Sequence, residues 1–240
     1  MVDIELLQNI ALLLICYAYI VLIILAAGKM ASHKLMSRKT SRKFLHMMIG
    51  NLPFLIPFFS YNSFPVNFPF FVAAPFILVS FLASSYSPSK RFYEKMSGLS
   101  ALTEGGHQLG LMFYSISYTV LALFFSAKPY VIAAGILPMA YGDASAALVG
   151  EKYGRRRYHV FADKSFEGSL TMFAVSFLGL AASLVFFSVL YPIPLHSSIS
   201  AALAVATVAT VAENFSPLGL DNLTVPLLSA LTFYVLTGGI

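Results

Sequence analysis

Apolar runs alternate with short polar stretches along the whole chain. Eight of these runs have a length suited to helices that cross a lipid bilayer, and they cover residues 4–27, 44–59, 68–83, 109–125, 131–149, 169–190, 197–212 and 223–236. The runs are continuous and lack the two-residue alternation of a membrane-spanning β-strand. The pattern therefore predicts an all-α, polytopic membrane bundle of about eight helices, which forms a single domain over residues 1–240.

Proline positions and one amphipathic stretch add detail to this pattern. Pro53 and Pro57 lie inside the second run. Pro69 would occupy the first turn of the third run, where proline is tolerated, and Pro75 would kink the same helix. Ser87 is a predicted cap for a short amphipathic helix, which we expect to lie on the membrane surface.

The composition favours membrane integration. Hydrophobic residues make up 58% of the chain and charged residues 10%, whereas about 25% charged residues are usual in soluble domains. Taken alone, the net charge of +5 would suggest that the protein binds nucleic acid. The basic residues cluster at the ends of apolar runs, however, so we expect lipid headgroups or a phosphorylated substrate and no nucleic acid. Cys16 is the only cysteine, which excludes an internal disulfide.

The charges are strongly one-sided in the predicted topology. The first run has Asp3 and Glu5 at its start and six basic residues after its end, so the N-terminus is expected outside. With eight spans, fourteen of the fifteen Lys and Arg residues lie in loops on one side, and only Lys128 lies opposite. This side should face the cytoplasm. Eight of the ten acids lie at or near the same face, which indicates a functional site there.

One acid, Asp143, lies inside an apolar run. It precedes the predicted helix end by about seven residues, or roughly 10 Å of helix. An ionisable side chain at membrane depth is a functional candidate by default, and the alternative is an acid paired with Lys or Arg for packing alone. Small residues between Gly142 and Gly150 would let either a second helix or a phosphate chain approach the backbone.

The loop that follows this run is rich in basic residues. The stretch 155–157 consists of three arginines, which suit a triphosphate or, equally, anionic lipid headgroups. Lys164 lies in the sequence KSFEG. Ser165 is predicted to cap the sixth helix, whose positive end would then face the same loop as Asp143.

A second polar loop, ENFSPLGLDN, joins the last two runs. Glu213 and Asp221 would supply carboxylate oxygens for a divalent cation on the same side as Asp143. Asp221 or Asn222 equally suits the N-cap of the last helix.

Other candidate motifs are weak or missing. Glu104 and His107 have the i, i+3 spacing of a metal pair, but the other ligands of a di-metal bundle are missing, so we interpret this spacing as chance. The sequence has no GxxxxGK[ST], HExxH, GxSxG or CxxC motif. Phosphate binding would therefore need a different scaffold.

Five segments occur in order along the chain: SRKFLH at 41–46, TEGGHQLG at 103–110, GDASAALVGEKYG at 142–154, KSFEG at 164–168 and ENFSPLGLDN at 213–222. Together they resemble the CTP-dependent polyprenol kinase family, which contains dolichol kinase, phytol kinase and the CTP-using diacylglycerol kinase. The resemblance covers nearly the whole chain. It implies an integral membrane enzyme that moves the γ-phosphoryl group of CTP onto a lipid alcohol at the cytoplasmic face.

The resemblance also implies roles for the matching positions. The catalytic residues would be Asp143, Lys164 and Glu167, and Mg²⁺ would be held by Asp143, Glu213 and Asp221. The resemblance points to nucleotide binding by Arg42, Lys43, Gly142, Gly150, Ser165, Gly168 and Asn222, and the charge of the basic loop adds Arg155, Arg156 and Arg157. Either Asp143 or Glu167 would accept the hydroxyl proton. The acceptor is open among dolichol-like, phytol-like, geranylgeraniol-like and diacylglycerol-like alcohols, and the oligomeric state is not readable from the sequence.

Two other functions fit the same features. A CTP:lipid-phosphate cytidylyltransferase would use the same nucleotide but release pyrophosphate. A transporter of an anionic metabolite would also place charges between helices, although here the charges lie on one face and no inverted repeat is visible.

Overall fold

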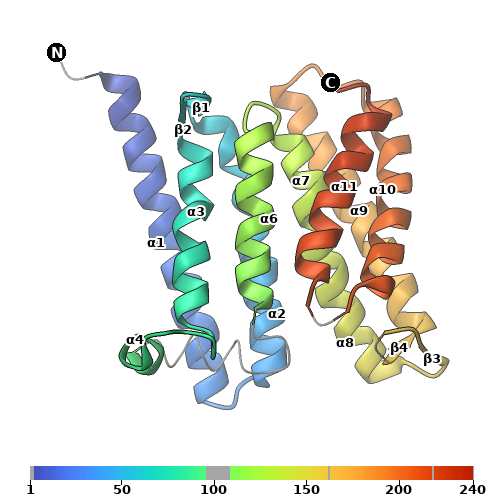
Figure 1. The fold of residues 1–240 in the computed structure, drawn as a ribbon. Helices are drawn as coiled ribbons and strands as arrows, with labels where there is room; N and C mark the ends of the chain where they lie inside the picture. Colours follow the sequence, from blue (N-terminus) through green and yellow to red (C-terminus); the bar gives the residue numbers. More distant parts are fainter. Residues whose placement is uncertain (1–2, 96–108, 162, 218, 240) are drawn as a thin grey trace. The chain divides into compact units, whose positions relative to one another are not determined.

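A computed structural model covers the chain and describes residues 3–95, 109–161, 163–217 and 219–239. The structure is 77% helical, which confirms the all-α prediction. The chain forms two compact units, Met1–Ala127 and Lys128–Ile240. In Figure 1 their helices run from blue to green and from green to red. The single domain expected from the sequence stays a prediction.

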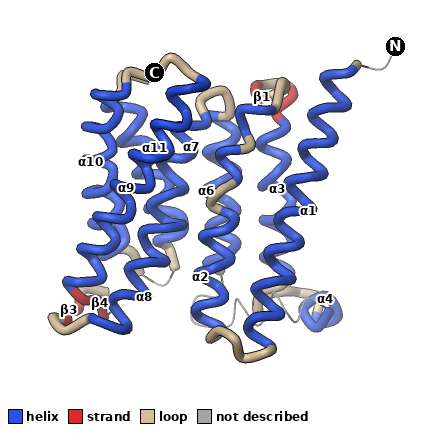
Figure 2. The backbone as a smooth tube through the Cα atoms, turned by 180° about the vertical axis from the view of Figure 1, so that it is seen from behind, coloured by secondary structure: helices blue, strands red, loops and turns tan. Residues whose placement is uncertain are grey.

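The first unit contains the long helices α1 (Ile4–Ser32), α2 (Arg38–Ile49), α3 (Phe68–Leu82) and α6 (Gly110–Phe125). α3 packs on α6, and α1 packs on both α2 and α3. Figure 2 shows this group from behind. A short hairpin of β1 (Asn62–Ser63) and β2 (Val66–Asn67) precedes α3, and the short helix α4 (Lys90–Lys95) follows it. α4 begins the stretch predicted to be amphipathic, the rest of which lies outside the described residues.

Asn67 joins two helices of the first unit. Its side-chain oxygen accepts the backbone N–H of Phe70 at 3.0 Å and so caps the start of α3. Its side-chain nitrogen donates to the backbone oxygen of Ala122 in α6 at 2.9 Å. Asn67 is buried, and these bonds satisfy both ends of its amide. The predicted third run is therefore confirmed as a helix, with Pro69 in its first turn and Pro75 inside it.

The second predicted run is wrong as a continuous helix. α2 begins earlier than predicted because Ser37 caps it, accepting the backbone N–H of Thr40 at 3.0 Å. After α2 the chain forms two single 3₁₀ turns, η1 (Leu52–Phe54) and η2 (Ile56–Phe58). Pro53 and Pro57 lie at the starts of these turns. Proline lacks the backbone N–H that an α-helix needs at interior positions, which explains why the helix does not continue.

The second unit is arranged around one helix of three consecutive parts: α7 (Pro129–Leu137), the π-helical segment η3 (Pro138–Asp143) and α8 (Ala144–Tyr153). The helices α9 (Phe166–Leu190) and α11 (Asp221–Leu236) pack against it, and α10 (Leu195–Phe215) packs on both α9 and α11. In the most apolar part of the three-part helix, 78% of the residues are buried, whereas the corresponding fractions are 28% in α9 and 33% in α10. The three-part helix is therefore the centre of this unit.

The lengths and apolar composition of the helices are those expected of a membrane protein. Four described helices are long and apolar enough to cross a bilayer: Ile4–Ser32, Pro129–Tyr153, Phe166–Leu190 and Leu195–Phe215. Three shorter apolar helices, Phe68–Leu82, Gly110–Phe125 and Asp221–Leu236, match further predicted runs. The total of eight spans, the outside N-terminus and the cytoplasmic site stay predictions.

Candidate functional site

Asp143 lies where the central helix of the second unit changes from π to α geometry. It is the last residue of η3, and its side chain is only 4% exposed. π-Helical turns are rare and occur often at functional sites. The structure thus buries Asp143 inside the unit, at a position where the backbone departs from the regular helix.

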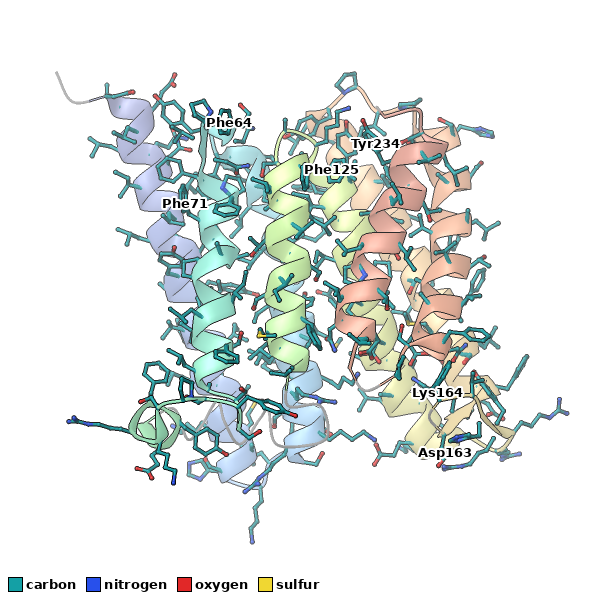
Figure 3. The ribbon with its side chains drawn as sticks, viewed as in Figure 1. Phe64, Phe71, Phe125, Asp163, Lys164 and Tyr234 are labelled. Atoms are coloured by element: carbon teal, nitrogen blue, oxygen red, sulfur yellow. The ribbon has the colours of Figure 1, made fainter. Side chains whose placement is uncertain are left out.

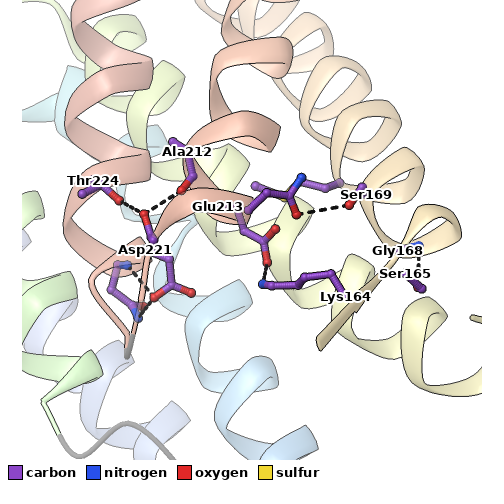
Figure 4. Close-up of polar contacts among 12 residues, drawn as sticks. Lys164, Ser165, Gly168, Ser169, Ala212, Glu213, Asp221 and Thr224 are labelled. Atoms are coloured by element: carbon purple, nitrogen blue, oxygen red, sulfur yellow. Dashed lines mark hydrogen bonds and ion pairs between the residues drawn. The ribbon is translucent and has the colours of Figure 1, made fainter. Parts of the chain in front are cut away.

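Lys164 and Glu213 form an ion pair near one end of the same unit. Lys164 is on the short strand β4 (Asp163–Ser165), and its Nζ contacts Oε1 of Glu213 in the last turn of α10. The Glu213 side chain is 6% exposed and that of Lys164 is 24% exposed. Figure 4 shows the pair at close range. In Figure 3, Lys164 and Tyr234 lie at opposite ends of the second unit.

The acidic side chains around Lys164 raise the pKa of its ammonium group. Burial alone would lower the pKa of the Lys164 ammonium group, but the negative charges of Glu213, Asp143 and Asp221 outweigh it and hold this pKa above its ordinary value. All three predicted metal ligands are thus close enough to influence one lysine. The structure joins Lys164 and Glu213 in direct contact, and the charges of Asp143 and Asp221, on two further elements, act on the same lysine.

Asp221 and Asn222 are the first two residues of α11, and neither occupies its N-cap position. Leu220 occupies the N-cap position. Asp221 Oδ1 accepts hydrogen bonds from the backbone N–H and the side-chain nitrogen of Asn222, each at 3.0 Å. The same side-chain nitrogen lies 3.1 Å from the backbone oxygen of Gly219. The N-cap alternative for these two residues is therefore wrong.

The basic loop forms a small hairpin. β3 (Arg157–His159) pairs with β4 in antiparallel register, so that Tyr158 lies opposite Lys164. The arginines of this loop, Arg155, Arg156 and Arg157, are all exposed. The helix before it runs on to Tyr153, so the loop begins at Gly154, which is four residues later than the predicted exit at Gly150.

Ser165 and Glu167 hold the start of α9. Ser165 Oγ accepts the backbone N–H of Gly168 at 3.1 Å, which confirms the predicted cap. The Glu167 carboxylate accepts the backbone N–H groups of Arg155 at 3.1 Å and Arg156 at 3.4 Å. Glu167 therefore ties the basic loop to the first turn of α9.

The small residues near Asp143 let two helices approach each other. A Cβ added at Gly142 would contact the side chains of Ser176 and Met172 in α9. A Cβ added at Gly168 would lie 3.4 Å from the Cα of Gly150. Of the two explanations open at the level of the sequence, close helix packing is the one that these contacts support.

Other predicted residues lie in the first unit or outside the described chain. Arg42 and Lys43 lie on α2 and are half-buried, and the ring of His46 on the same helix lies 4.8 Å from that of Tyr114. The structure does not place them with respect to the second unit. Glu104 and His107 lie outside the described residues.

The spacing of the acidic side chains bears on whether the site could hold Mg²⁺. In the described part of the chain, no group of three or more His, Cys, Asp or Glu side chains is close enough to hold a metal. Mg²⁺ usually keeps several waters and binds one or two carboxylates together with substrate phosphates. Within the described residues, the carboxylates therefore do not form a Mg²⁺ site from protein ligands alone, and an ion held there would need oxygen ligands from water or a bound phosphate.

Sequence reasoning missed three residues that surround the ion pair. Tyr158 is hydrogen-bonded to both Ser169 in α9 and Asn214 in α10. The available signal was weak: Asn214 follows Glu213 directly, and Tyr158 is an aromatic residue among basic ones. The register of the hairpin, which the sequence does not show, brings them together.

Comparison with known proteins gives relatives of one kind. A phytol kinase of Synechocystis is 45% identical over 130 residues, which are 53% of this chain and 54% of that protein. A probable chloroplastic phytol kinase of Triticum aestivum is 30% identical over 226 residues, or 89% of this chain and 72% of that protein. A chloroplastic farnesol kinase of Arabidopsis thaliana is 27% identical over 130 residues, covering 42% of its length. No protein-family model and no solved structure matches the chain.

The apolar helices and the Lys164–Glu213 ion pair indicate a helical protein of the membrane class with a charged candidate site, and the relatives that it matches are named as kinases. Because it covers 72% of the wheat protein at 30% identity, the chain belongs to the polyprenol kinase family, in which the phytol and farnesol kinases are found. The predicted resemblance is thus confirmed. The match spans about half the length of the cyanobacterial relative.

Proposed function

We propose that the chain is a kinase that transfers a phosphoryl group from CTP to a polyprenyl-type lipid alcohol such as phytol or farnesol. The observation that carries the proposal is the Lys164–Glu213 pair with Asp143 and Asp221 around it, in a family of kinases named for such alcohols. Phosphoryl transfer chiefly needs alignment of the reactants and neutralisation of charge. A half-buried lysine that feels several carboxylates would provide groups for both tasks.

Lys164 is the proposed phosphate ligand. Its raised pKa keeps the ammonium group charged at physiological pH, and a lysine acts on phosphate as a compact point charge. The exposed arginines 155–157 would attract the nucleotide from the aqueous phase. Arg42, Lys43 and Asn222 stay proposed nucleotide ligands, as do the backbones of Gly142, Gly150 and Gly168 and the hydroxyl of Ser165.

Asp143 and Asp221 are the proposed carboxylates for Mg²⁺, together with the phosphates of the nucleotide. Glu213 is the third candidate, and in the structure it pairs with Lys164. When bound, Mg²⁺ would neutralise part of the phosphate charge.

Asp143 is the better candidate for the base. The alcohol oxygen attacks the γ-phosphorus, the bond from this phosphorus to the β–γ bridging oxygen breaks, and CDP leaves. The hydroxyl proton passes to a carboxylate. Glu167 already accepts two backbone N–H groups of the basic loop, whereas Asp143 is buried and its charge acts on Lys164. The site would face the cytoplasm, and the apolar tail of the alcohol would stay among the membrane helices.

The test is turnover by the purified protein with γ-labelled CTP, Mg²⁺ and a panel of phytol, farnesol, geranylgeraniol, dolichol and diacylglycerol. We expect a labelled lipid monophosphate together with CDP. Release of pyrophosphate would identify a cytidylyltransferase instead, and uptake into liposomes without turnover would identify a transporter. Asp143→Asn should abolish transfer while the protein elutes as a folded species in detergent. Normal activity of this variant would reject the site.

A further inference from the structure

A second polar contact lies beside the Lys164–Glu213 pair. Tyr158 Oη lies 2.8 Å from Oδ1 of Asn214 and is also hydrogen-bonded to Oγ of Ser169. Ser169 Oγ lies 3.3 Å from the same Asn214 oxygen. Figure 4 shows the Ser169 contact next to Glu213 and Lys164. These groups join the hairpin to the first turn of α9 and the last turn of α10.

The register of the hairpin links this contact to the ion pair. Tyr158 and Lys164 are directly opposite each other in the β3–β4 ladder, and opposite residues project their side chains from the same face of a sheet. Both side chains reach α10, where they meet the consecutive residues Asn214 and Glu213. One face of the hairpin is therefore attached to one turn of α10 at two neighbouring points.

The hydrogen atoms can be assigned consistently. Asn214 Oδ1 only accepts, so the Tyr158 hydroxyl donates to it over the 2.8 Å contact. The single hydroxyl proton of Ser169 is then donated either to the Tyr158 oxygen or to Asn214 Oδ1, which lies 3.3 Å away. Phenylalanine at position 158 would keep the ring but lose both hydrogen bonds.

The hairpin needs such an attachment. β3 and β4 have three residues each, and an isolated two-stranded hairpin is marginally stable in water. At its base, the backbone N–H of Phe166 donates to the Arg156 oxygen at 2.9 Å. Further along, His159 and Asp163 pair through exposed side chains, which contributes little. The Tyr158 contact lies between these two levels and at the same level as Lys164.

We propose that Tyr158, held by Asn214 and Ser169, is a positioning residue for Lys164. It fixes the strand on which Lys164 lies, so that the ammonium group stays at Glu213. The consequence for catalysis rests on the proposed kinase function, whereas the effect on the position of Lys164 does not.

The test compares Tyr158→Phe with Tyr153→Phe, which removes a phenolic oxygen from the exposed tyrosine at the end of α8. In the folded protein, the acetylation rate of each lysine is measured by mass spectrometry with an amine-reactive acetyl ester. Tyr158→Phe loses both hydrogen bonds of the hydroxyl, and because each one corresponds to about threefold to tenfold, labelling of Lys164 should become faster by at least that factor. Lys34, an exposed lysine of the first unit, is the internal reference, and neither variant should change its rate. Asn214→Leu should reproduce the effect of Tyr158→Phe.

Kinetics give the second measurement. In Tyr158→Phe, kcat/KM for CTP should fall by a similar factor while KM for the alcohol stays unchanged. In a Lys164→Met background, the added Tyr158→Phe change should weaken CTP binding no further, because its effect passes through Lys164. Unchanged Lys164 labelling in Tyr158→Phe, or equally faster labelling of all lysines, would overturn the inference. Faster Lys164 labelling in a protein that never turns over CTP would retain the positioning role and reject the kinase function.

Discussion

Replacing Gly168 by alanine tests how the small residues near Asp143 are used. The added Cβ would lie 3.1 Å from the backbone oxygen of Ala146 and 3.4 Å from the Cα of Gly150. Both atoms belong to the backbone of α8 and cannot rotate away as a flexible side chain can. Gly179 lies in the same helix, and among described atoms outside that helix backbone nothing lies within 4 Å of its added Cβ. Gly179→Ala is therefore the matched control.

The two variants separate two contributions to stability. Alanine is favoured over glycine inside a helix by about 0.5–1 kcal/mol, a gain that applies to Gly179 in the middle of α9 and is no larger for Gly168 in its first turn. Only Gly168→Ala forces α8 and α9 apart, and overpacking of this kind costs about 1–3 kcal/mol. The free energy of unfolding of Gly168→Ala should therefore lie below that of Gly179→Ala by about 1–3 kcal/mol.

Unfolding in detergent by titration with sodium dodecyl sulfate, followed by far-ultraviolet circular dichroism, measures this difference. Fluorescence is less suitable because the chain has no tryptophan. Equal unfolding free energies for the two variants would refute the packing argument. If Gly168→Ala instead lost CTP binding at unchanged stability, the small residues would be needed for the approach of phosphate.

Three further predictions concern the same cluster. Ser165→Ala removes the cap of α9 and should lower the free energy of unfolding by about 1 kcal/mol in the same titration. Because the pKa of Lys164 is raised above 10.5, the stabilisation from its charge is fully present below that pH and is lost only at higher pH. A rate profile should therefore show no lysine titration between about pH 6 and about pH 9. Lys164→Met should lower stability by about 3–5 kcal/mol, and the further change Glu213→Leu should restore stability but not transfer.

The helices could be predicted from the sequence where the apolar pattern was long and free of breaks. α1, α9 and α10 begin within three residues of the predicted runs. The second run failed because hydropathy does not record the missing backbone N–H of Pro53 and Pro57. Likewise, the π-helical turn before Asp143 has no signature in the apolar pattern, because it adds one residue to a turn without changing which residues are apolar.

Asp143 could be identified as a candidate because an ionisable side chain is rare inside an apolar helix, whereas Lys164, Glu213 and Asp221 were candidates because they lie in the polar loops on the same predicted side. Their partners could not, because partner choice depends on tertiary geometry. Glu167 was expected near the reacting groups, but its carboxylate accepts backbone N–H groups of the basic loop. The residues that fix Lys164 required the strand register and the last turn of α10, which no local motif defines.

Stability alone does not explain why charged side chains are gathered around Lys164. Burying an ion costs several kcal/mol even after relaxation, and apolar residues of similar volume often replace a buried ion pair with no loss of stability. Here three carboxylates act on one lysine, and Glu213 and Asp143 are almost completely buried. An excess of carboxylates over lysine suits a site that binds an anionic nucleotide together with a divalent cation. The lysine would attract the phosphates, and the carboxylates would attract the cation. The double change at Lys164 and Glu213 separates the two explanations. A stable but inactive protein means that the charges are there for transfer, whereas an unfolded one means that they hold the helices together and that the candidate site loses its physical basis.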